Sequence, residues 1–177
     1  MTDTNLYTKK EQISDISAKR PHLVILGAGA SLAACPSGDA NGNKLPIMTN
    51  LVETLELVDL LNTANVPHEG RNFEDVYSQI ASNPTLKELQ HTVEDRVAEY
   101  FNKLRLPEGP TIYDYLVLSL RPKDAIATFN WDPFLYQALE RNYAYTKLLP
   151  KFFFLHGCAI VGYCEKDMRQ GKLGRQC

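Results

Sequence analysis

Three short, largely apolar runs are each followed within two residues by glycine or a polar residue. They are Leu23–Leu26, Asp124–Thr128 and Phe152–Leu155. Short continuous apolar runs are typical of parallel strands. We therefore predict an α/β fold built on a Rossmann-like parallel sheet, in which residues 23–26 form a central strand covered on both faces.

Between the first two runs, apolar residues recur at helical spacing. One series contains Leu51, Leu55, Val58 and Leu61, and a longer one spans residues 86–104. Thr85 and Glu88 have the spacing of a capping box at the start of the longer series. Residues 72–80, 111–120 and 133–141 are predicted to form further helices. Residues 48–120 are thus expected to be a large helical insertion subdomain between the first and second strands.

The other segments are polar. Residues 1–20 are predicted to be an N-terminal polar arm with a short helix at 10–18, and residues 21–177 to be one domain. Residues 33–44, rich in Gly and Asn, are predicted to be a long functional loop. Three strands are fewer than an average sheet contains. We therefore expect the sheet to be incomplete at the C-terminus, with the chain part of a longer protein or another chain completing the sheet.

The segments that follow the three strands carry the candidate chemistry. They are Gly27-Ala28-Gly29-Ala30-Ser31, Thr128-Phe129-Asn130-Trp131-Asp132 and Leu155-His156-Gly157. Ligands of open parallel sheets bind outside the carboxyl ends of the strands. The three segments are therefore predicted to converge on one nucleotide.

Each segment also has a purely structural explanation. The glycines suit close approach of a phosphate, but also an ordinary strand-to-helix turn. Asn130 and Asp132 can bind ribose hydroxyls or a water, while Asp132 before Pro133 also suits a helix N-cap. His156 can act as a general base, or it can be a hydrogen-bonded core histidine.

Composition narrows the choice of partner and compartment. The net charge of −2, from 19 basic and 21 acidic residues, gives no electrostatic case for binding nucleic acid or an anionic membrane. No apolar run approaches the roughly 20 residues that span a bilayer, and the first residues lack the apolar centre of a signal peptide. We expect a cytoplasmic protein.

The cysteines are expected to be free thiols or metal ligands rather than disulfides. Cys158, Cys164 and Cys177 lack the spacing of two C-x₂-C pairs, so no metal site is predicted from this chain. Zinc would require further ligands beyond Cys177.

The three segments, in this order, resemble the sirtuin-type NAD-binding domain over roughly residues 21–164. Within the loop, Pro36-x-Gly38-Asp39 and Asn41-Gly42-x-Lys44-Leu45-Pro46 are closer to the bacterial sirtuin-like NAD hydrolases of anti-phage defence than to protein deacylases. Deacylases have a shorter loop with an aromatic-Arg pair, which this sequence lacks.

The resemblance implies roles for the matching residues. Gly27, Ala28, Gly29, Ala30 and Ser31 would hold the pyrophosphate of NAD. Asn130 would place the ribose or the attacking water, Asp132 would fix the nicotinamide ribose, and His156 would be the general base. NAD would be cleaved to nicotinamide and ADP-ribose, which depletes NAD. A homo-oligomer or a larger defence complex is the implied assembly.

Two other functions are open at this point. An NAD-dependent protein deacylase would need a peptide groove and a complete zinc module. A non-catalytic nucleotide-binding module that regulates or scaffolds a partner fits a sheet that lacks its remaining strands. The glycine-serine turn that carries the adenosine end in sirtuin-type sheets is not evident in this sequence.

Overall fold

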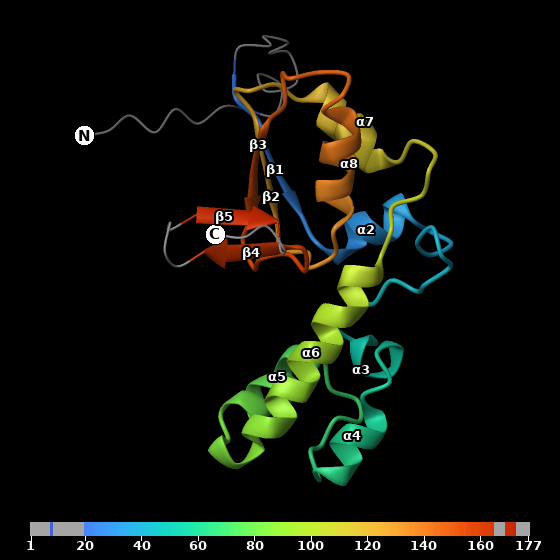
Figure 1. Cartoon of the computed structure of the whole chain (residues 1–177), viewed down its shortest axis with the longest axis vertical. Helices are drawn as coiled ribbons and strands as arrows, with labels where there is room; N and C mark the ends of the chain where they lie inside the picture. The colour runs from blue at the N-terminus through green and yellow to red at the C-terminus, as the bar shows by residue number, and fades with distance from the viewer. Residues whose placement is uncertain (1–7, 9–19, 165–168, 173–177) are drawn as a thin grey trace, which may run out of the picture.

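The computed structural model describes Thr8, residues 20–164 and residues 169–172. The helix predicted at residues 10–18, most of the polar arm and Cys177 lie outside these residues. The protein is a mixed α/β structure with an open sheet of three parallel strands and several helices (Figure 1).

The sheet consists of β1 (Leu23–Leu26), β2 (Ala125–Thr128) and β3 (Lys151–Phe154), in the order β1-β2-β3. All three strands were predicted from the apolar runs. Leu26 pairs with Thr128, and Thr128 pairs with Phe154. The three strands therefore end level with one another, which brings their following segments to the same edge.

The prediction that residues 23–26 form a central strand covered on both faces is wrong for the described sheet. Here β2 is central, with Ile126 fully buried, and β1 is an edge. Leu23 and Ile25 are 63% and 64% exposed, while Val24 and Leu26 pack against the core. Parallel strands share one register, so Phe153 of β3 lies on the same exposed face as Ile25. A continuous apolar run does not reveal how many of its faces are covered.

The chain also forms a two-stranded antiparallel hairpin that the sequence pattern did not predict. It consists of β4 (Val161–Cys164) and β5 (Arg169–Lys172). Each strand is only four residues long, and β5 (Arg-Gln-Gly-Lys) contains no apolar residue, so the pair lacks the longer apolar alternation by which a half-buried strand is recognised.

The helices lie in two places (Figure 1). Helices α2 (Ala28–Ala34), α7 (Ile112–Ser119) and α8 (Phe134–Asn142) lie beside the sheet, and α7 packs against α8. The others extend away from the sheet and are called the helical lobe below: α3 (Leu51–Thr54), α4 (Val58–Thr63), α5 (Phe73–Ala81), the 3₁₀ helix η1 (Pro84–Leu86) and α6 (Lys87–Lys103). A single cluster of buried apolar side chains joins the lobe to the sheet.

Two local details differ from the predicted helices. The capping box predicted at Thr85 and Glu88 is wrong: α6 has no side-chain cap, and Asn83 accepts a hydrogen bond from the Thr85 amide at 3.1 Å. A capping box does form at Thr111 and Asp114, at the start of α7. The Leu51–Leu61 series is split into α3 and α4, because Glu56 has a positive φ of 56°.

No helix in the described part of the chain has the length and apolar character needed to cross a membrane.

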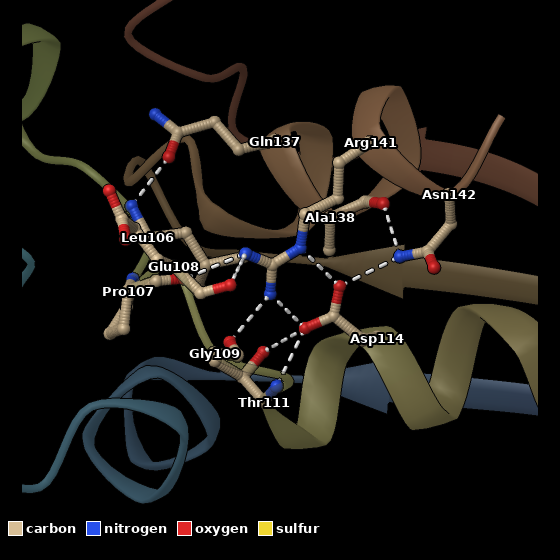
Figure 2. A network of polar contacts seen from close by, with 10 residues as sticks. All are labelled: Leu106, Pro107, Glu108, Gly109, Thr111, Asp114, Gln137, Ala138, Arg141 and Asn142. Carbon is tan, nitrogen blue, oxygen red and sulfur yellow. Dashed lines mark hydrogen bonds and ion pairs between the residues drawn. The ribbon is translucent and has the colours of Figure 1, made fainter. Parts of the chain in front are cut away.

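Arg141 fastens the connection between α6 and α7 to helix α8 (Figure 2). Its guanidinium donates to the backbone oxygen of Pro107 at 2.6 Å and to that of Gly109 at 3.1 Å. It also donates to both carboxylate oxygens of Asp114, with Nε 2.5 Å from Oδ1. The bidentate pair is the kind of ion pair that fixes geometry as well as energy.

Asp114 is the centre of this network. Besides the hydrogen bonds from Arg141, its carboxylate accepts three more, each at 2.7 Å. They come from the backbone amide and the hydroxyl of Thr111 and from the side-chain amide of Asn142. Burial raises the pKa of Asp114, but the hydrogen bonds from Arg141 and Thr111 outweigh burial and hold it well below its ordinary value. The start of α7, and with it Tyr113, is therefore fixed against α8.

The Asp114→Asn variant is expected to be about 3 kcal/mol less stable at neutral pH, because an uncharged amide faces donors that the carboxylate satisfied. The parent should also lose stability as the pH falls below about 4, since the unfolded chain then binds a proton that the folded protein rejects. Urea unfolding at pH 7 and pH 3 measures both effects, and the variant should show the smaller pH dependence.

Glu99→Gln is the matched control, since Glu99 forms its ion pair with Lys103 at the exposed surface of α6, at 2.6 Å. Equal stability of the two variants would show that the Asp114 network does not hold the fold.

Candidate functional site

The three predicted segments meet at the carboxyl end of the sheet. The backbone hydrogen bonds between the strands continue into these segments. The Phe129 amide donates to the Leu26 oxygen at 3.1 Å, and the Leu155 amide donates to the Thr128 oxygen at 2.9 Å. A cavity of about 200 Å³, called the inner cavity below, is lined by a residue of each segment: Ala28, Asn130 with Asp132, and His156. Its other wall is formed by Pro46, Ile47, Met48, Leu51, Phe101, Phe129 and Trp131.

The glycine segment begins helix α2 and is open on its outer side. Gly27 is the N-cap residue, and its carbonyl accepts a hydrogen bond from the Ala30 amide at 2.9 Å. A Cβ at Gly27 or Gly29 would meet no atom of the described residues within 4 Å, and neither residue has a positive φ. Neither backbone conformation nor internal packing among the described residues therefore requires glycine here, and the outer side of the segment has room for a further group.

Ser31 faces away from this open side, into the protein. Its hydroxyl donates to Asp132 Oδ2 at 2.6 Å, lies 2.7 Å from the Tyr113 hydroxyl, and accepts from Asn130 Nδ2 at 2.8 Å. Ser31 is 3% exposed. With one donor and two acceptor sites engaged, the hydroxyl has no capacity left for a phosphate. We call Ser31, Tyr113, Asn130 and Asp132 the Ser31 cluster.

Asn130 uses only part of its amide in this cluster. Its nitrogen donates to Ser31 and, at 3.0 Å, to the Gly27 carbonyl. Its backbone amide is bound by Thr128 Oγ1 at 3.1 Å. Within the described part of the chain, its side-chain oxygen accepts no hydrogen bond, and it is not sealed from solvent. Asn130 thus holds the glycine turn with its nitrogen and leaves an acceptor at the inner cavity.

Asp132 is buried beneath the same cavity. Its Oδ1 accepts from the Phe134 amide at 3.2 Å at the start of helix α8, but the N-cap residue is Pro133, so the predicted N-cap at Asp132 is wrong by one residue. Burial raises the pKa of Asp132, and the Ser31 hydrogen bond opposes the shift.

His156 lies at the surface, where it lines the cavity. Its ring packs edge to face against Phe129, with the ring centroids 4.9 Å apart. None of the described residues forms a hydrogen bond with the ring, and the following Gly157 has a positive φ of 77° that turns the chain. The imidazole is therefore reachable from solvent and from the cavity, unlike a hydrogen-bonded core histidine.

A second cavity of about 400 Å³, the outer cavity, lies against the first. Both are bordered by Phe101, Trp131 and His156. The outer cavity extends from these residues to α5 and α6 of the helical lobe, where its lining includes Phe73, Tyr77, Val93, Glu94, Val97 and Ala98, and to Gly157, Cys158 and Ala159. Its volume falls within the range of small-molecule sites.

The loop that follows α2 closes the inner cavity and is held by Asp39. The buried carboxylate accepts hydrogen bonds from the backbone amides of Asn41, Asn43 and Arg105 at 2.9, 2.7 and 2.9 Å. Gly38 has a φ of +99°, and a Cβ there would lie 2.7 Å from the Asn43 oxygen, so this turn does require glycine. The loop therefore has a fixed conformation and forms part of the cavity wall.

Sequence reasoning missed Tyr113 and Glu94. Tyr113 lies one position before the Asp114 of a capping box, a signal that predicts the helix but not the direction of the ring. Glu94 is one of two adjacent carboxylates, with Asp95, between the apolar residues Val93 and Val97 of α6, and the spacing alone does not distinguish the two. Both reach the site only through tertiary packing.

The buried thiols are unreactive in this arrangement. Burial, with Asp132 as a further cause, raises the pKa of Cys35 and of Cys158 to about 11, so both remain protonated at neutral pH. Among the described residues, no group of three or more His, Cys, Asp or Glu is placed to hold a metal ion.

Comparison with known proteins adds no identification. A scan against protein-family models found no match, and a search of curated proteins found none either.

The Ser31→Ala variant is expected to be about 2–3 kcal/mol less stable, because Asp132 and Tyr113 would be left buried without their shared partner. Urea unfolding monitored by circular dichroism measures the loss.

Ser37→Ala, at an exposed serine of the following loop, is the control and should change stability little. If Ser31→Ala also left the stability unchanged, the Ser31 cluster would not be what fixes the glycine segment.

Proposed function

We propose that this chain binds NAD⁺ in a Rossmann-like domain and hydrolyses its N-glycosidic bond, giving nicotinamide and ADP-ribose. One observation carries the proposal: Ala28, Asn130 and His156, from the ends of three parallel strands, line a single cavity. This is where nucleotides bind in open α/β sheets. The order of the three segments, which resembles that of sirtuin-type domains, supports NAD⁺ as the nucleotide.

The proposed contacts divide between backbone and side chains. The pyrophosphate would approach the backbone at Gly27, Ala28, Gly29 and Ala30, where the open outer side leaves room. Ser31 and Asp132 would act through the Ser31 cluster, by holding the glycine segment and the Asn130 amide in place. The free side-chain oxygen of Asn130 would accept a hydrogen bond from a ribose hydroxyl or from the attacking water.

The chemistry assigned to His156 is proton removal. A water molecule attacks C1′ of the nicotinamide ribose, the C1′–N1 bond breaks, and nicotinamide leaves with the bonding electrons as a neutral base. The water proton passes to the neutral imidazole. Positive charge develops on the ribose during this step, and a cavity that excludes water would strengthen its interaction with nearby dipoles.

The resemblance to bacterial sirtuin-like NAD hydrolases also implies a role in the cell. A cytoplasmic NAD⁺ hydrolase of the bacterial anti-phage type would deplete NAD once activated, and would act within a homo-oligomer or a larger defence complex. The exposed apolar face of the sheet, formed by Leu23, Ile25 and Phe153, is compatible with such an assembly.

A non-catalytic nucleotide-binding module is the second candidate. It is favoured by the absence of any hydrogen bond from described residues to the His156 ring, because general bases in enzymes are usually oriented by a further group. The two functions differ in whether nicotinamide is released.

Nicotinamide release from NAD⁺, measured by chromatography without any peptide, is the deciding experiment. His156→Ala is expected to lower kcat about 10²- to 10⁴-fold, the usual contribution of a general base. Its unfolding midpoint should match that of the parent, because the ring is exposed.

His91→Ala, at an exposed histidine of α6, is the control and should retain full activity. Equal release by parent and His156→Ala would remove His156 from the mechanism. Binding of NAD⁺ without release would support the non-catalytic module, and release only with an acylated peptide would indicate a deacylase.

Gly29→Ala separates binding from folding. Alanine is favoured over glycine within a helix by about 1 kcal/mol, so the variant should be as stable as the parent or slightly more stable. Its added methyl group should nevertheless weaken NAD⁺ binding at least tenfold by blocking the approach of the pyrophosphate, as measured by calorimetry.

Gly70→Ala is a poor control because Gly70 has a positive φ of 69°. Ala33→Gly, at an exposed position of the same helix α2, is better, since it should lower stability and leave binding intact. Unchanged affinity in Gly29→Ala would move the pyrophosphate away from this segment.

A further inference from the structure

The outer cavity combines aromatic rings with one carboxylate. Phe73, Tyr77, Phe101 and Trp131 line it, and Trp131 packs edge to face against Phe73 and Phe101 with centroids 6.1 and 5.8 Å apart. Among the described lining residues there is no lysine or arginine, and Glu94 is the only carboxylate. Aromatic walls with a carboxylate favour an organic cation over a neutral or anionic ligand.

The Glu94 carboxylate is held in place at this wall. Its Oε1 accepts hydrogen bonds from the Tyr77 hydroxyl and from Gln90 Nε2, the latter at 2.8 Å. His91, whose Nδ1 lies 3.6 Å from Oε2, is its neighbour on the solvent side. The hydrogen bond from Tyr77, followed by that from Gln90, lowers the pKa of Glu94, so the group is a carboxylate at neutral pH.

His156 connects this cavity to the inner one, since it lines both. A dinucleotide whose pyrophosphate lies at the glycine segment would therefore pass His156 on its way into the outer cavity. The glycosidic bond would then lie next to the proposed base. The group beyond that bond is the nicotinamide ring, which is a pyridinium cation in NAD⁺ and a neutral dihydropyridine in NADH.

We propose that the outer cavity is the binding site for the oxidised nicotinamide ring, with Glu94 as the residue that selects the pyridinium cation over neutral rings. This inference rests on the proposed function for the identity of the dinucleotide. It adds a specificity residue on α6 and assigns the helical lobe a part in substrate recognition.

The charge of the ring predicts which kinetic constant Glu94 controls. The ring is cationic in bound NAD⁺ and becomes neutral as the bond breaks, so Glu94 interacts more strongly with the substrate than with the departing nicotinamide. Interactions made in the ground state lower KM without raising kcat. Glu94→Gln should therefore raise KM for NAD⁺ about fivefold, a size suited to a partly exposed charge, and reduce the preference for NAD⁺ over NADH in binding.

A small probe tests the cavity without the rest of the dinucleotide. Trp131 is the one tryptophan in the sequence and lines the cavity, so its fluorescence reports occupancy directly. The 1-methylnicotinamide cation should bind the parent about fivefold more tightly than neutral nicotinamide. Glu94→Gln should remove that difference.

Asp95→Asn is the matched control, because Asp95 is the next residue on α6, carries the same charge, is exposed and does not line the cavity. It should keep the parent's preference for the cation. Ala98→Met, which fills the cavity from an exposed position of α6, should weaken binding of both probes.

The outcomes separate this inference from the proposed function. Equal binding of the two probes by the parent, or an unchanged preference in Glu94→Gln, would overturn the nicotinamide site even if NAD⁺ is hydrolysed. A Glu94-dependent preference for the cation in a protein that neither binds nor cleaves NAD⁺ would keep the cation site and overturn the proposed function.

Discussion

The buried hydroxyl of Ser31 holds the candidate site together. It joins helix α2 to Asp132 and Asn130 after β2 and to Tyr113 of α7, with distances of 2.6–2.8 Å. Each of these partners is buried, so a polar group left without its partner would be costly. The cluster fixes the inner side of the glycine segment, while its outer side is open. Rigid support of this kind is what a binding loop needs in order to present its backbone to a ligand.

The Arg141–Asp114 pair extends the same support one step further. It fixes the start of α7, from which Tyr113 reaches the Ser31 cluster, and it anchors the connection that leads from α6 of the helical lobe to α7. The lobe and the sheet share one apolar core. The walls of the two cavities, which come from both parts, are therefore positioned by the same set of buried contacts.

The two cavities that meet at His156 have different linings. The inner cavity is lined by Ala28 of the glycine segment and by Asn130 and Asp132, and the outer one by aromatic rings and the Glu94 carboxylate. His156 borders both and is open to solvent. In the proposed function, His156 would therefore lie beside the bond that joins the ribose to the nicotinamide ring.

The sequence by itself determined the three strands, most of the helices and the convergence of Gly27–Ser31, Asn130–Asp132 and His156. These features depend on local periodicity and on the rule that parallel strands present their carboxyl ends at one edge. Tertiary structure alone decided that β1 is an edge strand, that Ser31 turns inward, and that Tyr113 and Glu94 belong to the site. Ser31 and Tyr113 are 82 positions apart, and Ser31 and Asp132 are 101 apart. Contacts at such separations depend on how helices pack, and helical periodicity marks the buried face of a helix without naming the side chain that it will meet.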